Sequence, residues 1–340
     1  MAARALLAAI GLLLLLFFAR PAAPARPVEE WRLAMDTVVK VELYVAADEA
    51  PALMEAAFAE IDRIDSLMSG YSDLSEVSYI NRTAGARAVA CSPDMAQVLS
   101  RSLHFARHSE GAFDVSLGAL TRLWNIPDAV APPGTAQIDS ALALSGPGRV
   151  YLEDSRVRFE RPGVQLDLGA VAKGFAVDRA VDRLIEAGAA AGLIEAGGDI
   201  LYWGEKPDGR PWRFGVQHPR DREHIVAAAD VGLPAIATSG DYERFFEHGG
   251  RRFHHLLDPA TGYPARHAVS ATVWTHNAMD ADILATAVFV LGPERGLDWV
   301  ESLAATECLV FYQEEDTLLH RATSGVADKL EFLHKSELMF

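Results

Sequence analysis

The stretch Asp167-Leu-Gly-Ala-Val-Ala-Lys173-Gly174 joins two contrasting patterns. Residues 164–168, which lead into this stretch, alternate apolar and polar side chains and predict a strand. Residues 170–185, which begin within it, space their apolar side chains along one face of a helix. We therefore predict a strand, a turn at Gly169 and a helix, with Asp167 at the end of the strand.

The start of this predicted helix is a candidate anion site. Unpaired N–H groups and the helix dipole give a helix N-terminus a partial positive charge, which favours a phosphate. Lys173 adds a full positive charge in the first turn. The stretch matches neither the phosphate-binding pattern GxxxxGK[ST] nor the dinucleotide pattern GxGxxG. Two interpretations stay open, a phosphate site and a plain strand–turn–helix with a solvated lysine.

The composition is that of a globular protein with an acidic surface. The chain has 340 residues, half of them hydrophobic and 23% charged, with a formal net charge of −16. This length is enough for one large or two modest domains. An acidic surface repels nucleic acid and anionic membranes, so neither is an expected partner. An anionic ligand would need a local basic spot, and Lys173 is a candidate for it.

The N-terminus predicts a targeting segment. Arg4 precedes fourteen consecutive residues, 5–18, that form an apolar core, and Ala23-Pro-Ala25 offers small residues for cleavage. A run of this length fits a signal peptide better than a spanning helix, which needs about 20 residues. We expect residues 1–25 to be a signal peptide and residues 30–340 to form one domain outside the cytoplasmic membrane. An uncleaved N-terminal anchor is the alternative.

Strand and helix patterns are mixed along the rest of the chain without regular alternation, which favours the α+β class over α/β. Residues 129–148 are rich in Pro, Gly and Ala and predict an irregular surface insertion. The predicted helices span 50–68, 75–81, 93–110 and 278–291, the last ended by Gly292. The predicted strands lie within 31–45, 149–168 (two strands), 192–203 (two strands), 212–217, 235–239, 253–257 and 270–276.

Two oxygen donors are predicted to share a helix face. Asp282 and Thr286 are four residues apart within the predicted helix 278–291. A carboxylate and a hydroxyl are hard ligands that suit Mg²⁺. The structural alternatives are that Thr286 bonds the main-chain carbonyl one turn earlier, and that first-turn acids only stabilise the helix start. For Asp280 we favour that structural role.

The histidines and cysteines predict no zinc or disulfide framework. Adjacent residues on a strand point to opposite faces, so His254 and His255 cannot readily share one metal. His104 and His108 have helical spacing but no evident third ligand, which favours a surface pair. Cys91 and Cys308 form no CxxC motif, and two buried thiols are favoured over one bridge. Asp258-Pro-Ala-Thr-Gly262 has the residues of a tight turn.

Seven short motifs follow one another along residues 35–292. They are Met35-x-Thr37, Gly111-Ala-Phe-Asp-Val-Ser-x-Gly118, Asp167-Leu-Gly-Ala-x-Ala-Lys-Gly174, Gly197-Gly-Asp199, Thr238-Ser-Gly-Asp-Tyr242, His255-Leu-Leu-Asp-Pro-x-Thr-Gly262 and Ala281-Asp-x-x-Ala-Thr-Ala287. In this order they resemble the motifs of the FAD:protein FMN transferases, the ApbE family. The chain departs from the family's usual Met-Gly-Thr, because Asp36 stands in place of glycine.

The resemblance implies an α+β fold of the ApbE or T-fold-like type, with antiparallel sheets, packed helices and a flavin cleft between a larger and a smaller part. The isoalloxazine ring would lie near Met35 and Tyr71. The other implied FAD-binding residues are Ala112, Phe113, Asp114, Asp167, Lys173 and Leu256. The implied metal ligands are the Ala170 main-chain carbonyl, Asp282 and Thr286. Asp282 and His255 are the implied catalytic residues, the latter for positioning or base work.

The resemblance also implies a reaction. With Mg²⁺, FMN would pass from FAD to a Thr or Ser hydroxyl of an exported electron-transfer protein through a phosphoester bond, releasing AMP. Implied acceptors include subunits of the sodium-pumping NADH:quinone reductase or of Rnf-type complexes. The expected location is the periplasm, with membrane contact only through the N-terminal segment or the partner. Two alternatives stay open, a Mg²⁺-dependent FAD pyrophosphatase giving FMN and AMP, and a periplasmic flavin-binding protein without turnover.

Overall fold

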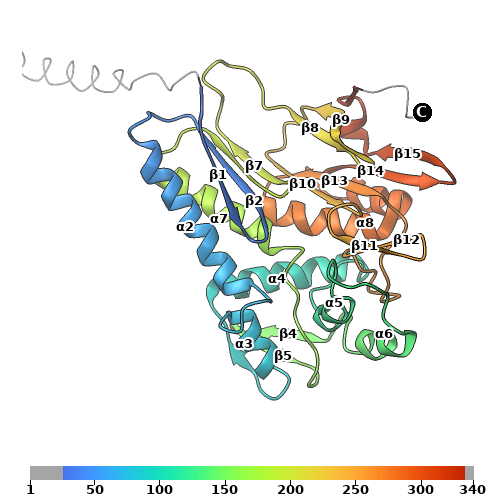
Figure 1. The fold of residues 1–340 in the computed structure, drawn as a ribbon. Helices are drawn as coiled ribbons and strands as arrows, with labels where there is room; N and C mark the ends of the chain where they lie inside the picture. Colours follow the sequence, from blue (N-terminus) through green and yellow to red (C-terminus); the bar gives the residue numbers. More distant parts are fainter. Residues whose placement is uncertain (1–25, 334–340) are drawn as a thin grey trace, which may run out of the picture.

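An eight-stranded sheet forms the centre of the computed structural model, which describes residues 26–333 (Figure 1). The predicted signal peptide lies outside the described residues. Every pair of neighbouring strands in this sheet is antiparallel. The strands, in spatial order, are β1 (Val28–Ala34), β2 (Thr37–Leu43), β6 (Gly192–Ala196), β7 (Asp199–Trp203), β10 (Ala235–Gly240), β13 (Ser270–Thr275), β14 (Glu307–Glu314) and β15 (Thr317–Ala322).

Three long helices pack side by side along this sheet: α2 (Ala50–Met68), α7 (Ala172–Glu186) and α8 (Ala278–Glu301) (Figure 1). A three-stranded sheet of β8 (Phe214–His218), β9 (Asp221–Ala229) and β16 (Glu331–Phe332) packs on the opposite face. The side chains of strand β10 point alternately to the two faces of the central sheet. Ala235 and Ala237 belong to the core between the sheet and the helices, and Ile236 belongs to the core between the sheet and strands β8 and β9. Alternation along one strand thus fills two hydrophobic cores.

A smaller part lies beyond the ends of α2 and α7, in the lower half of Figure 1. Its helices are α3 (Glu76–Thr83), α4 (Pro93–His108), α5 (Gly118–Trp124) and α6 (Thr135–Leu142). Its strands β3 (Val89–Ala90), β5 (Arg156–Phe159) and β4 (Val150–Glu153) form a short sheet. The hairpin of β11 (Phe245–His248) and β12 (Arg251–His254) lies beside α8, and α9 (Ser324–Ala327) is near the end of the described chain. Within residues 26–333, no helix has both the length and the apolar character needed to cross a membrane.

The predicted α+β class with antiparallel sheets is confirmed, and so are several elements. Helix α2 has the predicted bounds, and residues 192–203 form the predicted pair of strands, β6 and β7. The predicted helix end at Gly292 is a break within α8, where φ is 80°, and the helix then resumes. Cys91 and Cys308 are both free thiols, of which only Cys308 is buried.

Three predicted elements are wrong in detail. Residues 164–168 form no strand beyond one bridge at Gln165, because the Asn81 side chain accepts from the Leu166 N–H at 2.7 Å and donates to its carbonyl at 3.0 Å. The helix predicted to reach residue 110 ends at His108, since Glu110 and Gly111 have φ of 54° and 83°. The insertion at 129–148 is not irregular throughout, because it contains α6 and buries Ile138.

The single strand predicted within residues 31–45 is a hairpin of β1 and β2. Ala34 pairs with Thr37, so Met35 and Asp36 form a two-residue turn with φ of 51° and 58°. A type I′ turn requires positive φ at both central residues, and Asp tolerates this conformation better than most side chains. Asp36 therefore replaces the glycine of the family motif without opening the turn.

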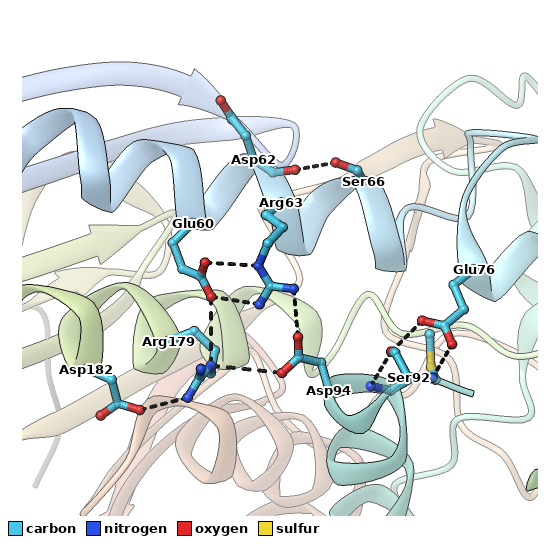
Figure 2. Close-up of polar contacts among 10 residues, drawn as sticks. Glu60, Asp62, Arg63, Ser66, Glu76, Ser92, Asp94, Arg179 and Asp182 are labelled. Atoms are coloured by element: carbon cyan, nitrogen blue, oxygen red, sulfur yellow. Dashed lines mark hydrogen bonds and ion pairs between the residues drawn. The ribbon is translucent and has the colours of Figure 1, made fainter. Parts of the chain in front are cut away.

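A network of charged side chains fixes α7 against α2 and α4 (Figure 2). Arg63 contacts Glu60 and Asp94 at 2.7 Å each, and Arg179 lies 3.8 and 4.0 Å from the same two acids. Arg179 also pairs with Asp182 at 3.3 Å. The network holds in place the helix that begins beside Lys173 and so positions the candidate site.

Candidate active site

Lys173 lies between two acidic side chains from separate elements. Its Nζ is 2.9 Å from Oδ2 of Asp199, the first residue of β7, and 3.2 Å from Oδ2 of Asp282 on α8. Asp199 and Asp282 are 2% and 4% exposed. The interpretation of Lys173 as a solvated lysine is therefore wrong, because its charge is paired in a largely buried cluster, here called the acidic cluster (Lys173, Asp199 and Asp282).

The acidic cluster places two carboxyl groups around one ammonium group. Burial raises the pKa of Asp199 well above its usual range, and the nearby charge of Asp282 raises it further. Burial alone would lower the pKa of Lys173, but the charges of Asp199 and Asp282 outweigh it and raise that pKa. Lys173 thus stays protonated between two carboxyl groups, and burial disfavours the ionised form of Asp199. The predicted contact of Lys173 with FAD stays a prediction.

The acidic cluster forms because α7 and α8 cross closely at their N-termini. Gly174 permits the contact, since a Cβ atom there would lie 2.2 Å from the Ala278 carbonyl oxygen. One turn later, the Asp178 carboxylate accepts from the N–H groups of Ala278 and Met279 at 2.7 and 2.9 Å. Both contacts fix the start of α8 and thereby hold Asp282 beside Lys173.

Asp280 has the structural role that the sequence favoured. The N-cap residue Asn277 accepts from the Asp280 N–H at 2.8 Å and donates to its carboxylate at 2.9 Å. Arg101 of α4 donates to both carboxylate oxygens at 2.6 Å. The Asp280 carboxylate therefore supports the Asn277 cap and ties the helix to α4, and its bidentate pairing with Arg101 leaves little capacity for a metal.

The predicted Mg²⁺ ligands have suitable chemistry. Thr286 Oγ1 lies 3.3 Å from Ser239 Oγ on β10, so its hydroxyl faces the sheet one turn after Asp282. The Gly174 N–H, which a continuous helix would direct to the Ala170 carbonyl, donates to Asp282 Oδ2 at 3.3 Å. Among the hydrogen bonds within residues 26–333, none ends on that carbonyl. Carboxylate, hydroxyl and carbonyl oxygens are the donors that Mg²⁺ prefers, so these residues fit the ion.

The described part of the chain contains no cluster of three His, Cys, Asp or Glu side chains able to hold a metal. A cation bound at Asp282 would therefore complete its coordination with hydroxyl, main-chain, water or substrate oxygens. Mg²⁺ commonly does so, because it keeps waters and binds substrate phosphates rather than all-protein cages.

His255 is neutral and oriented by the main chain. Its main-chain N–H and its ring Nδ1 both contact the Arg244 carbonyl oxygen, at 3.1 and 3.3 Å. Because a carbonyl oxygen only accepts hydrogen bonds, Nδ1 carries the proton and Nε2 is an acceptor. Burial lowers the pKa of His255 to about 3, and the charge of Lys173 contributes, which places the ring near the acidic cluster. Such a weak base favours positioning over proton abstraction. His254 instead contacts the Ala265 carbonyl at 2.8 Å.

The predicted FAD-binding residues around Phe113 pack beneath the site. Ala112, Phe113 and Leu256 are 9%, 2% and 6% exposed and belong to the same hydrophobic core. Burial raises the pKa of Asp114, although the Ser116 N–H donates to its Oδ1 at 2.7 Å. These residues form an apolar wall with one buried carboxyl group.

Asp167 lies beside this wall. Its N–H donates to the Val115 carbonyl at 2.8 Å, and its Oδ1 accepts from the Gly169 N–H at 2.8 Å. The first bond aligns the segment before α7 with the segment that carries Asp114. The structure thus brings Asp114 and Asp167 to adjacent segments.

Met35 and Tyr71 lie near the C-terminal end of α2. The Asp65 carboxylate of α2 lies beside the Met35 main chain, and Tyr71 follows the helix with 79% of its surface exposed. Thr37, next to the same turn, lies against Gly197, where an added Cβ would be 2.5 Å from its Oγ1. The Met35 turn therefore adjoins the β6–β7 turn that leads into Asp199.

Comparison with known proteins identifies the family. The model of the ApbE family matches residues 35–310. The chain belongs to the ApbE family. It is 32% identical to a FAD:protein FMN transferase of Treponema pallidum, over 92% of this chain and 91% of the relative. A FAD:protein FMN transferase of Vibrio cholerae is 35% identical over 72% of this chain and 75% of the relative's length.

Solved ApbE structures share the fold. The ApbE protein of Thermotoga maritima superposes with a TM-score of 0.78 at 32% identity, covering 84% of this chain and 94% of its own. The flavin transferase ApbE of Vibrio cholerae superposes with a TM-score of 0.79 at 28% identity, covering 89% of this chain and 98% of its own. The resemblance predicted from the seven motifs is confirmed, and the chain is an enzyme of the ApbE family.

The sequence did not single out three polar residues of this ApbE site. Asp199 was visible only as the last residue of Gly197-Gly-Asp199, and Ser239 only within Thr238-Ser-Gly-Asp-Tyr242. Asp178 carries no motif signal, because its role depends on how α7 crosses α8. The one sequence signal that could have identified Asp199 is an acid directly after two glycines at the start of a predicted strand.

Proposed function

We propose that this protein transfers FMN from FAD to a hydroxyl group of an acceptor protein. The observation that carries the proposal is the acidic cluster beside Thr286 and the unbonded Ala170 carbonyl. It combines carboxyl groups with other oxygen donors, the arrangement that suits Mg²⁺ and a bound pyrophosphate. The relatives named FAD:protein FMN transferase, at 32% and 35% identity, support the same activity.

In this proposal Asp282, Thr286 and the Ala170 carbonyl hold Mg²⁺, which when bound neutralises charge on the pyrophosphate. Lys173 pairs with Asp282 and fixes the direction of its carboxylate. His255 accepts a hydrogen bond at Nε2 and so orients the attacking hydroxyl. Positioning and charge neutralisation supply most of the catalysis in phosphoryl transfer, so this set of residues is adequate.

The reaction joins a Thr or Ser oxygen of the acceptor to the FMN phosphorus and breaks the phosphorus–oxygen bond to AMP. The hydroxyl proton is released to the leaving AMP phosphate or to solvent, and AMP leaves with the bridging oxygen. We place the reaction outside the cytoplasmic membrane, since residues 1–25 have the pattern of a signal peptide. Exported electron-transfer proteins, such as subunits of the sodium-pumping NADH:quinone reductase or Rnf-type complexes, are the acceptors that we propose.

The test is to incubate the protein with FAD, Mg²⁺ and a periplasmic acceptor domain that has an exposed threonine. The acceptor should gain the mass of FMN less one water, stable to denaturation, and AMP should appear in equal amount. An acceptor Thr→Ala variant should stay unlabelled while FAD binding to the enzyme is unchanged. Rapid AMP release without any labelled acceptor would instead identify a pyrophosphatase, and binding without AMP would identify a flavin-binding protein.

A further inference from the structure

The acidic cluster leaves the pyrophosphate of FAD without an obvious cationic side chain. Lys173 is paired with two carboxylates, at 2.9 and 3.2 Å, so its charge is already balanced. The chain as a whole has a net charge of −16, which opposes an anionic substrate. Mg²⁺ would neutralise part of the pyrophosphate charge, and a cationic side chain near the site would add to its effect; this inference rests on the proposed function.

Arg244 lies beside His255 at the end of the β11–β12 hairpin. The hairpin register pairs Phe245 with His254, and the next pair along is Arg244 with His255, joined by the N–H···O bond of 3.1 Å. Directly opposed residues of an antiparallel pair project their side chains from the same face. The charges of Arg244 and Lys173 both lower the pKa of His255, so both cations are near its ring.

Arg244 is an unusual arginine in this chain. Several arginines within residues 26–333 have side chains that contact neither an acid nor a carbonyl oxygen. Arg244 is half-buried, whereas the other arginines of this group are exposed. Its neighbouring acids do not balance it, because each pairs with another arginine. These pairs are Asp241 with Arg220 at 2.6 Å and with Arg252 at 3.4 Å, Glu243 with Arg222 at 3.8 Å, and Glu247 with Arg252 at 3.7 Å.

We propose that Arg244 binds the pyrophosphate of FAD, from the side of the site that His255 occupies. A guanidinium group suits this role, since its planar donors bind two phosphate oxygens at once. Holding an arginine half-buried without a partner is costly, and a bound phosphate would remove that cost. The His255 ring, whose Nδ1 donates to the Arg244 carbonyl, would then present its Nε2 acceptor to the attacking hydroxyl beside that phosphate.

The experiment measures the affinities of FAD and riboflavin, which lacks the phosphates, by flavin fluorescence quenching. Arg244→Gln should weaken FAD binding about 10- to 100-fold, the range expected for a charge-assisted contact, and leave riboflavin binding within about twofold. Arg244→Lys should restore part of the FAD affinity because the charge returns without the bidentate geometry. The matched control is Arg251→Gln, an exposed arginine of the same hairpin, which should behave as wild type.

Equal losses for FAD and riboflavin in Arg244→Gln, or no loss for either, would overturn the assignment while leaving the proposed function intact. A loss of FAD affinity in Arg251→Gln as large as that in Arg244→Gln would also overturn it, because the effect would then be general to the hairpin charge. Wild-type protein that neither binds FAD nor labels an acceptor would overturn the proposed function, and Arg244 would lose its role with it.

Discussion

The acidic cluster and the β11–β12 hairpin differ in the balance of their charges. In the cluster two carboxylates share one lysine, whereas on the hairpin side the acids are outnumbered and Arg244 has no acid partner. Carboxyl groups suit a metal cation, and a guanidinium group without an acid partner suits a phosphate. If Arg244 binds the phosphate as we propose, the main role of Lys173 is to pair with Asp199 and Asp282.

The largest expected effect comes from removing the one carboxylate among the proposed metal ligands. Asp282→Ala should reduce FMN transfer by at least about 100-fold, because Mg²⁺ loses its only charged protein ligand. The fold should survive, since Lys173 keeps its contact with Asp199 at 2.9 Å. AMP release measures the effect, and Thr286→Ser, which keeps the hydroxyl, is the matched variant expected to retain activity. Parental turnover in Asp282→Ala would show that the metal assignment is wrong.

The next effect concerns stability and tests the ion pairs of the acidic cluster. Lys173→Met should lower the free energy of unfolding by about 3 kcal/mol, because it leaves two buried carboxylates unpaired. Adding Asp199→Asn should recover part of that loss, since one of the two charges is removed. Urea unfolding measures both, with the exposed Lys329→Met as a control expected to change by less than about 0.5 kcal/mol. A Lys173→Met variant as stable as wild type would mean that the cluster is not charge-coupled.

A smaller effect should appear in the pH dependence of stability. The pKa of His255 is lowered to about 3 in the folded state, whereas an unfolded histidine titrates near 6.5. Between these values the unfolded chain binds the extra proton, so the free energy of unfolding falls as pH falls, by at most about 1.4 kcal/mol per pH unit. His255→Gln should flatten this slope, whereas the exposed His276→Gln should not. Identical slopes in His255→Gln and wild type would place the ring in water.

Local patterns allowed much of the fold to be predicted. Helix α2 was predicted to the residue because Pro51 marks its start and an apolar stripe runs along it. The segment 164–168 was mistaken for a strand because its hydrogen-bond partner is the side chain of Asn81, more than eighty residues away in sequence. An alternation of apolar and polar residues predicts which side chains face the core, but it does not show which groups hydrogen-bond the main chain.

The sequence supplied the candidate site residues but not how their charges are paired. The seven motifs identified the Asp282, Thr286 and His255 positions, and the structure places them on α8 and beside β12. The pairing of Lys173 depends on the close crossing of α7 and α8 at Gly174, which no local pattern reveals. The unpaired state of Arg244 likewise depends on how four other arginine–acid contacts are arranged around it.

The most direct test of the two-sided site measures FAD affinity with and without Mg²⁺ in wild type, Asp282→Asn and Arg244→Gln. Our account predicts that Mg²⁺ strengthens FAD binding in wild type and in Arg244→Gln, and that Asp282→Asn abolishes this gain. It also predicts that Arg244→Gln weakens FAD binding even without Mg²⁺, since the guanidinium acts independently of the ion. A Mg²⁺ gain that persists in Asp282→Asn, or that disappears in Arg244→Gln, would contradict the division of metal and phosphate binding between the two sides.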